Sequence, residues 1–429
     1  MQPNEKRPLN TASIAALAFT GAVLLACAVF FCFVSCSNGD YVRPDDTLVI
    51  HAAGVETPSA TVLPTPTVQY AFITPQPVQQ GAAQETQAPV YYNFSITIGG
   101  LAAFQSDITQ SLLNDPGYSE QDVFAHISRY IHADRNIVVL DNLLSNSANY
   151  TDTMAPGVCA AALHQAGFDT VVLSNDHVLD YDTDGLLNTV GILNSEGMTV
   201  NGTGAGAGEG ITFININGAK IALVSYTETL TGKSAERLTV MPEAVTVYSA
   251  EQARSDLQYA REQGAEFVIV FMYWGKEEAE SVSAAQRDIA QTLSLYGADA
   301  IIGTNPHIAQ PLEMLIGYNE LTGRPQRTLV AYSMGSLITE SRENREHISS
   351  FLLHLEVTCS SDDVRFVSVG YTPLYIWNDR ANNNNRFYSV YSAGEAPEGM
   401  SDTQKTYMEH SLQFIKNRMD NGVAVMVSD

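Results

Sequence analysis

From about residue 91, short apolar runs rich in β-branched residues alternate with segments of helical spacing, and this alternation limits the possible folds most strongly. Runs such as NIVVL, DTVVLSN and AEFVIVFMYWG have the length and composition of buried strands. Between them, segments such as APGVCAAALHQAG have helical spacing and end at a glycine. The run SEQDVFAHISRYIHADR, residues 119–135, also has helical spacing, and the run ITFININGAKIALVSY alternates around Asn217-Gly218, which predicts a hairpin. Helices that alternate with apolar strands predict a mainly parallel sheet covered on both faces. The strand-rich second half predicts a second sheet packed beside the first.

The N-terminal part of the chain predicts an anchor and a tether rather than a folded domain. An uncharged apolar run follows Lys6 and Arg7 and is long enough to cross a bilayer as a helix. A cleaved signal peptide and a lipoprotein signal ending at Cys36 are the alternatives. All three place the folded part outside the cytoplasm, and the anchor predicts a single-pass protein of the cell membrane. The predicted segments are a cytoplasmic N-terminus (1–11), a transmembrane signal anchor (12–35), a linker rich in Pro, Thr and Gln (36–90), the folded domain (91–395), and a C-terminal helix and tail (396–429).

The net charge of the chain argues against two classes of binding partner. A formal net charge of -25 disfavours binding to nucleic acid or to an anionic membrane surface, because like charges repel.

Only Cys159 and Cys359 lie in the folded part of the chain. Nothing in the sequence places them near each other, so two buried free thiols are favoured over a disulfide.

Polar side chains follow four of the predicted strands at the point where each strand ends. In a parallel sheet ligands bind outside the carboxyl ends of the strands, so loops from several strands can converge on one site. Asn, Asp, His and Glu are typical ligands of a hard or borderline metal ion. The four clusters are Asp141–Asn142, Asn175–Asp176–His177, Tyr273–Trp274–Gly275 with Glu277, and Asn305–Pro306–His307.

Three further motifs are weaker. The run DYDTDG from Asp180 matches the start of a calcium loop, but Gly191 stands where the closing Glu belongs. We therefore expect Asp184 or Thr183 to cap the following helix. The run GTGAGAGEG lacks the Lys-Ser/Thr of a phosphate-binding loop. The run AYSMGS around Ser333 lacks the first Gly of a nucleophile elbow.

The motifs LHQAGFDTVVLSNDHVLDYDTDGLLNT, YWGKE, GADAIIGTNPHIAQPLE and VAYSMGS, together with the spacing of Gln286, resemble the CapA-type capsule synthesis proteins. The resemblance covers residues 93 to 375. That family is associated with poly-γ-glutamate capsules and has a calcineurin-like metallophosphoesterase fold. The resemblance therefore implies an α/β protein with four layers, two β-sheets flanked by helices, and a two-metal site at the strand ends.

Several metal-ligand positions that the resemblance implies are substituted in this chain. A Gly, a Leu, a Tyr and an Asn stand where the family has an Asp, a Glu and two His residues; they are Gly100, Leu144, Tyr273 and Asn305. A two-metal hydrolase needs a bridging carboxylate to offset the repulsion between two dications. We therefore expect the site to hold at most one divalent ion, manganese or similar, and to hold it weakly.

The residues that remain predict the candidate site. Asn142, Asn175, His177 and His307 are the predicted metal ligands, and His177, Asp176 and Glu277 are the predicted catalytic residues. Each has a plainer interpretation: the two asparagines tie loops together through the backbone, the histidines are satisfied within a polar cleft, and Glu277 is solvated. Trp274 is predicted to belong to the core.

Two functions follow from this site. In the favoured one, the protein is a catalytically inactive member that binds an anionic envelope polymer or a capsule assembly protein. In the alternative, it is an anchored hydrolase or ligase-associated enzyme that acts on a phosphoester or an anionic polymer. One metal ion held by His177, His307 and Asp176 would then support the reaction.

Overall fold

The computed structural model describes the part of the chain that follows the predicted linker. The described residues are 89–114, 118–147, 150–204, 210–228, 230, 232–242, 244–342, 344–380, 386–396 and 400–427. They fall within one unit of the chain, Gln84–Asp429. The predicted anchor and nearly all of the predicted linker lie outside the described residues. Within the described ranges, none of the helices combines the length and the apolar character that crossing a membrane requires.

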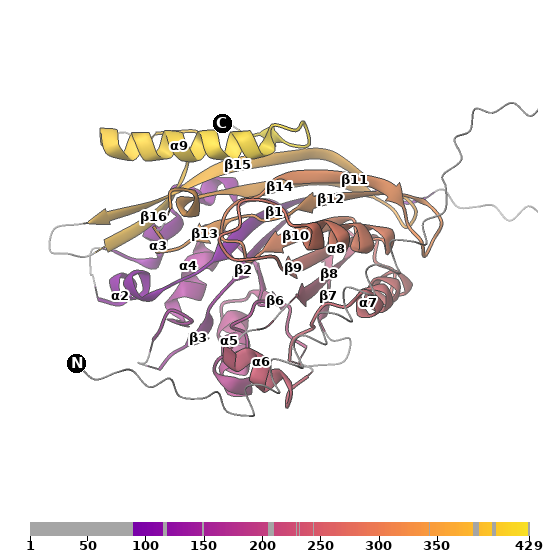
Figure 1. The fold of residues 1–429 in the computed structure, drawn as a ribbon, viewed down its shortest axis with the longest axis horizontal. Coiled ribbons are helices and arrows are strands. Elements are labelled where there is room, and N and C mark those ends of the chain that lie inside the picture. Colours follow the sequence, from indigo (N-terminus) through magenta and orange to yellow (C-terminus); the bar gives the residue numbers. More distant parts are fainter. Residues whose placement is uncertain are drawn as a thin grey trace, which may run out of the picture. The chain divides into compact units, whose positions relative to one another are not determined.

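The first of two large sheets contains the N-terminal strands of the unit (Figure 1). Its order is β16 (Arg386–Ser392), β15 (Val364–Arg380), β14 (Ser349–Cys359), β1 (Tyr92–Ala102), β2 (Arg135–Leu140), β5 (Thr170–Val172) and β6 (Thr199–Asn201), while β13 (Ser336–Ile338) pairs with β1 and β17 (Val425–Met426) with β15. Strands β1, β2, β5 and β6 are parallel to one another, and β14 to β16 are antiparallel. The predicted parallel sheet is thus confirmed, with an antiparallel extension on one side.

The second sheet has the order β11 (Leu312–Tyr318), β12 (Pro325–Ala331), β10 (Ala300–Thr304), β9 (Phe267–Tyr273), β8 (Ala219–Thr227) and β7 (Ile211–Ile216). Strands β8, β9, β10 and β12 are parallel, so their carboxyl ends lie at one edge. Strands β7 and β8 form the predicted hairpin. Its turn residues Asn217 and Gly218 both have positive φ, 53° and 96°, as a two-residue hairpin turn requires. A small third sheet pairs β3 (Leu143–Ser145) with β4 (Met154–Pro156).

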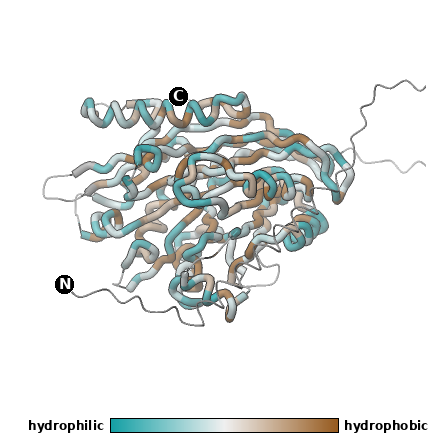
Figure 2. The backbone as a smooth tube through the Cα atoms, viewed as in Figure 1, coloured by the Kyte–Doolittle hydropathy of each residue, from teal (hydrophilic) through white to brown (hydrophobic). Residues whose placement is uncertain are grey.

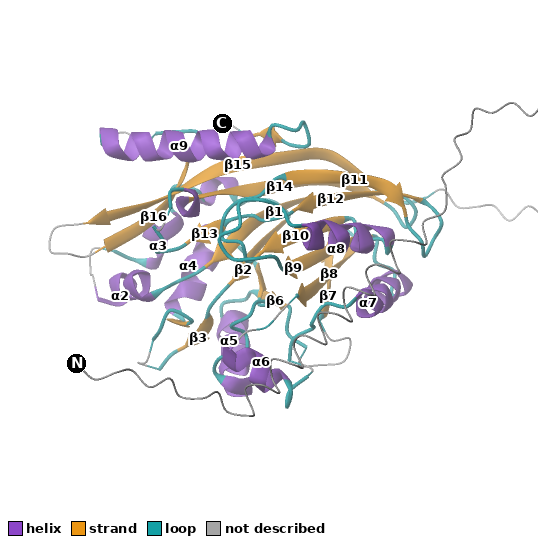
Figure 3. Ribbon diagram, in the orientation of Figure 1, coloured by secondary structure: helices purple, strands orange, loops and turns teal. Residues whose placement is uncertain are grey.

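Helices cover the outer faces of both large sheets (Figure 3). The helices are α2 (Ser106–Asn114), α3 (Glu120–Phe124), α4 (Val158–Ala166), α5 (Asp182–Ser195), α6 (Gly232–Leu238), α7 (Ala250–Glu262), α8 (Ala284–Leu295) and α9 (Asp402–Met419), with 3₁₀ turns at Ser128–Tyr130 and Glu346–Ile348. Apolar residues of α4 and α5 pack on the first sheet, and those of α7 and α8 on the second. Helix α9 packs along β14 and β15.

The strands explain why the chain forms four layers. In β2, Ile137 and Val139 face the core between the two sheets, while Val138 and Leu140 face the helices on the outer side. Strand β9 alternates in the same way between the inter-sheet core and α7 and α8. Both faces of β2 and β9 are buried, so their runs IVVL and FVIVFM are apolar throughout. Hydrophobic segments, brown in Figure 2, are concentrated in the middle of the folded unit. The predicted four-layer α/β sandwich of two sheets flanked by helices is confirmed.

Two local predictions are wrong. Helical spacing predicted a long helix over residues 119–135, but α3 ends at Phe124 and β2 begins at Arg135. The segment between them contains a 3₁₀ turn, and its apolar residues are buried without forming an α-helix. The helical spacing of these residues therefore reflects their burial. Helix α5 begins at Asp182, with Tyr181 as its N-cap residue and no side-chain capping bond, so neither Thr183 nor Asp184 is the cap. Both Cys159 and Cys359 are buried free thiols, as predicted.

Candidate functional site

The loops after β2, β5, β9 and β10 converge, as the sequence predicted. The phenol of Tyr273, at the end of β9 in one sheet, donates a hydrogen bond of 2.7 Å to Asp176, which follows β5 in the other sheet. Both side chains are buried. His177 Nε2 lies 3.6 Å from the same Asp176 oxygen, Oδ1. The site therefore lies at the carboxyl ends of strands from both sheets.

Asp141, directly after β2, lies at the electrostatic centre of this site. Its Oδ1 is buried and accepts no hydrogen bond from any described residue. Burial raises the pKa of Asp141, His307 and His177 lower it, and the nearby carboxylates of Asp176 and Glu277 raise it further. The sequence interpretation gave no role to Asp141, although its position at the end of a buried strand was the available signal.

His177 is held between carboxylates. Its Nδ1 lies 2.9 Å from Oδ2 of Asp180, and Oδ1 of Asp180 accepts a hydrogen bond of 3.0 Å from the Ser234 hydroxyl on α6. Burial lowers the pKa of His177, but Asp141, Asp176 and Asp180 together outweigh burial, so its pKa is raised. Relative to a free histidine, the site thus favours the imidazolium form of His177.

The pKa of His307 is shifted in the opposite direction to that of His177. Burial lowers its pKa, and Asp141 only partly compensates. Its Nδ1 lies 3.4 Å from the hydroxyl of Ser336 at the start of β13. The pKa values of the two histidines of the site are thus shifted in opposite directions.

The backbone of two facing loops is strained at this site. Asn305, His307 and Glu278 have φ values of 87°, 59° and 61°, in the region that favours glycine. The loops are tied together by the Asn305 amide, which donates 2.8 Å to the Gly275 carbonyl, and by the Glu278 N–H, which donates 3.0 Å to the Pro306 carbonyl. Strained non-glycine backbone persists where surrounding contacts enforce it, and it clusters at functional sites.

The side chains of Asn142 and Asn175 tie loops together. Oδ1 of Asn142 accepts from the Phe104 N–H at 2.6 Å, and its nitrogen donates to the carbonyls of Phe104 at 3.1 Å and Asp152 at 2.8 Å. The Asn175 nitrogen donates to the Leu140 carbonyl at 2.8 Å, and its oxygen accepts from the His177 N–H at 2.8 Å. Strand β5 ends at Val172, so strand alternation does not orient Asn175 and His177.

Glu277, the third predicted catalytic residue, is exposed at the rim of the site. Its carboxylate is close enough to raise the pKa of Asp141. The neighbouring Trp274 is buried, and its indole nitrogen donates 2.8 Å to the Tyr332 carbonyl, so it belongs to the core as predicted.

At three of the positions where the resemblance implies a metal ligand, the structure places no anionic side chain. A side chain at Gly100 would overlap the carbonyl oxygen of Gly335, so this position has no room for a carboxylate as the backbone stands. Leu144 is buried in the core behind the first sheet. Burial raises the pKa of Tyr273 far above its usual range, so its phenol is a donor to Asp176 rather than an anionic ligand. In the part of the chain that the structure covers, no three His, Cys, Asp or Glu side chains are arranged to hold a metal ion.

A second carboxyl group with an altered pKa lies after β13. Oε1 of Glu340 accepts a hydrogen bond of 2.7 Å from the Ile108 N–H in the first turn of α2. Burial raises the pKa of Glu340 to about 7; the bond from Ile108 opposes this, and the nearby Asp107 and Asp152 add to it. The sequence gave no signal for this group, because α2 was not predicted.

Together, the layers and the convergent polar loops define a four-layer α/β protein with a polar site at the strand ends. A sequence profile described as "Bacterial capsule synthesis protein PGA_cap" matches residues 95–341, more than half of the chain. The chain belongs to this family of bacterial capsule synthesis proteins.

Two curated relatives carry related names. The PGA biosynthesis protein CapA of Bacillus subtilis (strain 168) is 25% identical over 197 residues, which cover 44% of this chain and 47% of the relative. The capsule biosynthesis protein CapA of Bacillus anthracis is 23% identical over 254 residues, covering 55% and 58%. The chain thus spans about half the length of the curated relatives it matches.

Solved structures show a more distant likeness. The NAD nucleotidase NadN of Haemophilus influenzae aligns with a TM-score of 0.39 and 13% identity, over 79% of this chain and 57% of that one. The calcineurin-like phosphoesterase YfkN of Bacillus subtilis aligns with a TM-score of 0.34 and 12% identity, over 76% and 98%. At these scores the likeness carries no functional inference.

Proposed function

We propose that this protein is a membrane-anchored, extracytoplasmic component of capsule or poly-γ-glutamate synthesis, and that its degenerate metal site acts in binding or assembly. Family membership supports the capsule context. The apolar run after Lys6 and Arg7 supports the anchor. Recovery of the full chain in the membrane fraction is the expected result, and its recovery in the culture supernatant would contradict the anchor.

One observation carries the binding role: the amides at two predicted ligand positions, and the phenol at one substituted position, are already used within the protein. The amides of Asn142 and Asn175 bond to backbone groups of neighbouring loops, and the Tyr273 phenol bonds to Asp176. Each would have to give up hydrogen bonds before it could serve a metal ion, and breaking buried hydrogen bonds is costly. The site is therefore better suited to holding its loops in a fixed shape than to two-metal hydrolysis.

A second candidate, a single-metal hydrolase, is favoured by the buried Oδ1 of Asp141, which has no hydrogen-bond donor among the described residues. Asp141, Asp176, His177 and His307 would be the donors. A bound cation would polarise a phosphoester or acidify a water molecule. As the side chains stand, no three of them meet around one point within the described ranges, so the loops would have to rearrange.

Metal analysis of the full chain purified in detergent, beside a phosphodiesterase assay with added manganese, separates the two candidates. We expect no stoichiometric metal and no turnover. Bound metal with turnover that is lost in His177→Ala, but kept in the control His164→Ala on an exposed face of α4, would establish the hydrolase instead.

Complementation in the native host gives a second test. We expect deletion of the gene to reduce capsule formation, and the unchanged chain to restore it. Normal capsule formation after deletion of the gene would contradict the capsule role.

A further inference from the structure

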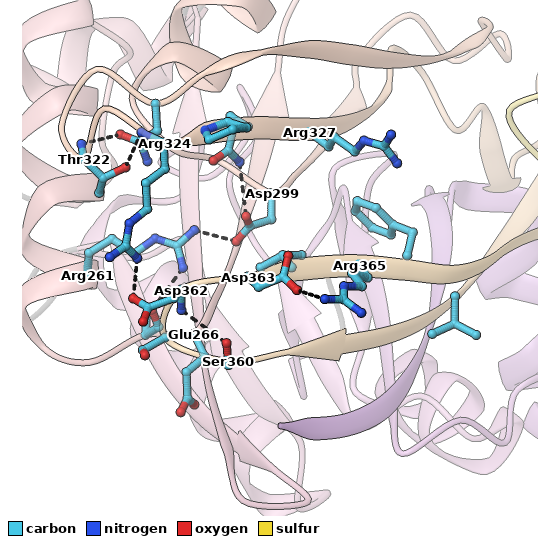
Figure 4. A pocket seen from close by; sticks show the side chains of 18 of the residues that line it. Arg261, Glu266, Asp299, Thr322, Arg324, Arg327, Ser360, Asp362, Asp363 and Arg365 are labelled. Carbon is cyan, nitrogen blue, oxygen red and sulfur yellow. Dashed lines mark hydrogen bonds and ion pairs between the residues drawn. The ribbon is translucent and has the colours of Figure 1, made fainter. Parts of the chain in front are cut away.

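A second site lies at the opposite edge of the sheets. A groove of about 980 Å³ is lined by the segment that leads from β11 into β12, by the turn between β14 and β15, and by residues 264–266 before β9 (Figure 4). These segments lie at the amino ends of the parallel strands β9 and β12, whereas the polar site lies at the carboxyl ends. The volume is at the upper end of the range of roughly 300–1,000 Å³ that is typical of ligand sites.

The groove has a different charge balance from the rest of the chain. It is lined by four arginines and four carboxylates, whereas the whole chain has 22 basic and 47 acidic residues. A polyanion is repelled by a protein of net charge -25, so it meets less repulsion in a groove whose arginines equal its carboxylates in number than the chain's average composition would give.

One of the arginines is structural. Arg261 donates 2.6 Å to Oδ2 of the buried Asp299, and also donates to the carbonyls of Ala265 at 3.0 Å and Gly297 at 2.9 Å. The same Asp299 oxygen accepts from the Val268 N–H at 2.7 Å. This pair holds β9 and β10 together and is not available to a ligand.

The remaining three arginines are available. Arg327 on β12 is exposed and has no ion pair or side-chain hydrogen bond among the described residues. Arg324 pairs with Asp362, and Arg365 lies 2.6 Å from Asp363; the side chains of both arginines are more than half exposed. The Arg324–Asp362 pair is exposed on both sides, and exposed ion pairs are weak, so a ligand carboxylate can replace Asp362. Oδ2 of Asp363 is buried and keeps its ion pair, so a ligand would meet the exposed part of the Arg365 side chain. In Figure 4, Arg324 lies at one end of the drawn pocket, and Arg327 and Arg365 lie at the other.

We infer that this groove binds a linear polycarboxylate, a chain whose carboxylates recur along its length, through Arg324, Arg327 and Arg365. The guanidinium fork matches a carboxylate with two parallel hydrogen bonds. The pairs with Asp362 and Asp363 show that arginines in this groove bind carboxylates. Spaced cations suit several carboxylates on one chain better than a single small anion. The inference rests on the proposed function, because a capsule component of the polyglutamate class would meet such a polymer.

The test is binding of fluorescein-labelled poly-γ-glutamate to the full chain in detergent, followed by fluorescence anisotropy at low and moderate salt. The groove variants are Arg327→Gln and the double variant Arg327→Gln/Arg365→Gln. A matched double variant, Arg129→Gln/Arg345→Gln, removes the same charge from exposed positions outside the groove. Polyphosphate and the uncharged polymer polyglutamine serve as comparison ligands.

We expect Arg327→Gln to weaken polyglutamate binding about tenfold, since a charge-assisted hydrogen bond is lost, and the double variant to weaken it further. The matched variant should bind within about twofold of the parent, and added salt should weaken binding. Circular dichroism would establish that each variant is folded; Arg327→Gln breaks no ion pair or side-chain hydrogen bond among the described residues.

The remaining outcomes are distinguishable. If the parent binds polyglutamate and all variants bind equally well, the groove is not the site, while the proposed function stands. If the parent does not bind at all, both the groove and the polymer-binding form of the proposed function fail. If polyphosphate binds with the same dependence on Arg327 and Arg365, the groove recognises polyanions in general and the assignment to carboxylates is wrong.

Discussion

Asn142 offers the sharpest separation between a structural role and a metal-ligand role. Its buried side chain makes three hydrogen bonds, to the N–H and carbonyl of Phe104 and to the carbonyl of Asp152. Each such bond contributes about 1 kcal/mol net, and a buried backbone group left without a partner costs more. Asn142→Ala should therefore lower the free energy of unfolding by roughly 3–5 kcal/mol, which is large beside the total of about 5–15 kcal/mol of ordinary domains.

Asn142→Asp makes the distinction sharper, because it keeps the shape and the acceptor oxygen but replaces the donor nitrogen by a second oxygen. That oxygen would face the carbonyls of Phe104 and Asp152, which lie 3.1 Å and 2.8 Å from the present nitrogen. If Asn142 has a structural role, Asn142→Asp should therefore be about as destabilising as Asn142→Ala. A metal ligand predicts the opposite, since a carboxylate binds a dication more strongly than an amide does.

The assay is urea unfolding of the full chain, followed by circular dichroism with and without manganese. Asn114→Ala is the control: Asn114 is exposed and donates one local bond to the Gln110 carbonyl, so its removal should change stability by less than about 0.5 kcal/mol. The structural reasoning is refuted if both Asn142 variants match the parent without manganese, or if Asn142→Asp gains stability when manganese is added.

Three further predictions concern the packing and titration of the site and its surroundings. Gly100→Ala should lower the free energy of unfolding in urea by about 1–3 kcal/mol, because the new Cβ would overlap a backbone carbonyl. The control Gly191→Ala places a Cβ in open space within α5 and should be neutral or stabilising. Equal effects of the two substitutions would contradict the clash. Burial raises the pKa of Glu340 to about 7 from 4.5, so the folded state binds more protons between these values and stability falls as pH rises through them. In Glu340→Gln the difference in unfolding free energy between pH 5 and pH 8 should shrink, and an unchanged difference would exclude Glu340 as its source. Tyr273→Phe removes the donor to buried Asp176 and should cost about 1–3 kcal/mol in thermal unfolding; an unchanged midpoint would count against this bond.

The layered fold was predictable because burial on both faces leaves a strong pattern in the sequence. In the run IVVL of β2, alternate residues enter different cores, so the whole strand had to be apolar. The Asn217–Gly218 hairpin was predictable because few residues tolerate the positive φ of its turn. The predicted helix over 119–135 was wrong because burial by turns produced the same spacing.

The candidate site was predictable in place but not in detail. Convergence of the loops follows from parallel strands, whose carboxyl ends share an edge. Residue roles depend instead on contacts between segments distant in sequence. Asn142 reaches back 38 residues to Phe104, and Tyr273 reaches back 97 residues to Asp176. The role of Asp141 also depends on contacts between distant segments. Only the folded structure shows that one of its oxygens is buried without a hydrogen-bond donor in the described part of the chain.

The charge of the site also bears on where a polymer of the capsule class would bind. The acidic groups of the site, Asp141, Asp176, Asp180 and Glu277, outnumber its two histidines, so this edge is lined mainly by acidic side chains. A polycarboxylate brought to that edge would meet repulsion at every repeat. At the opposite edge the arginines of the groove equal the carboxylates in number, and one of them has no partner among the described residues. Electrostatics thus favours a division of labour in which the groove holds the polymer, while the rigid site at the strand ends serves an assembly partner of cationic or hydrogen-bonding character.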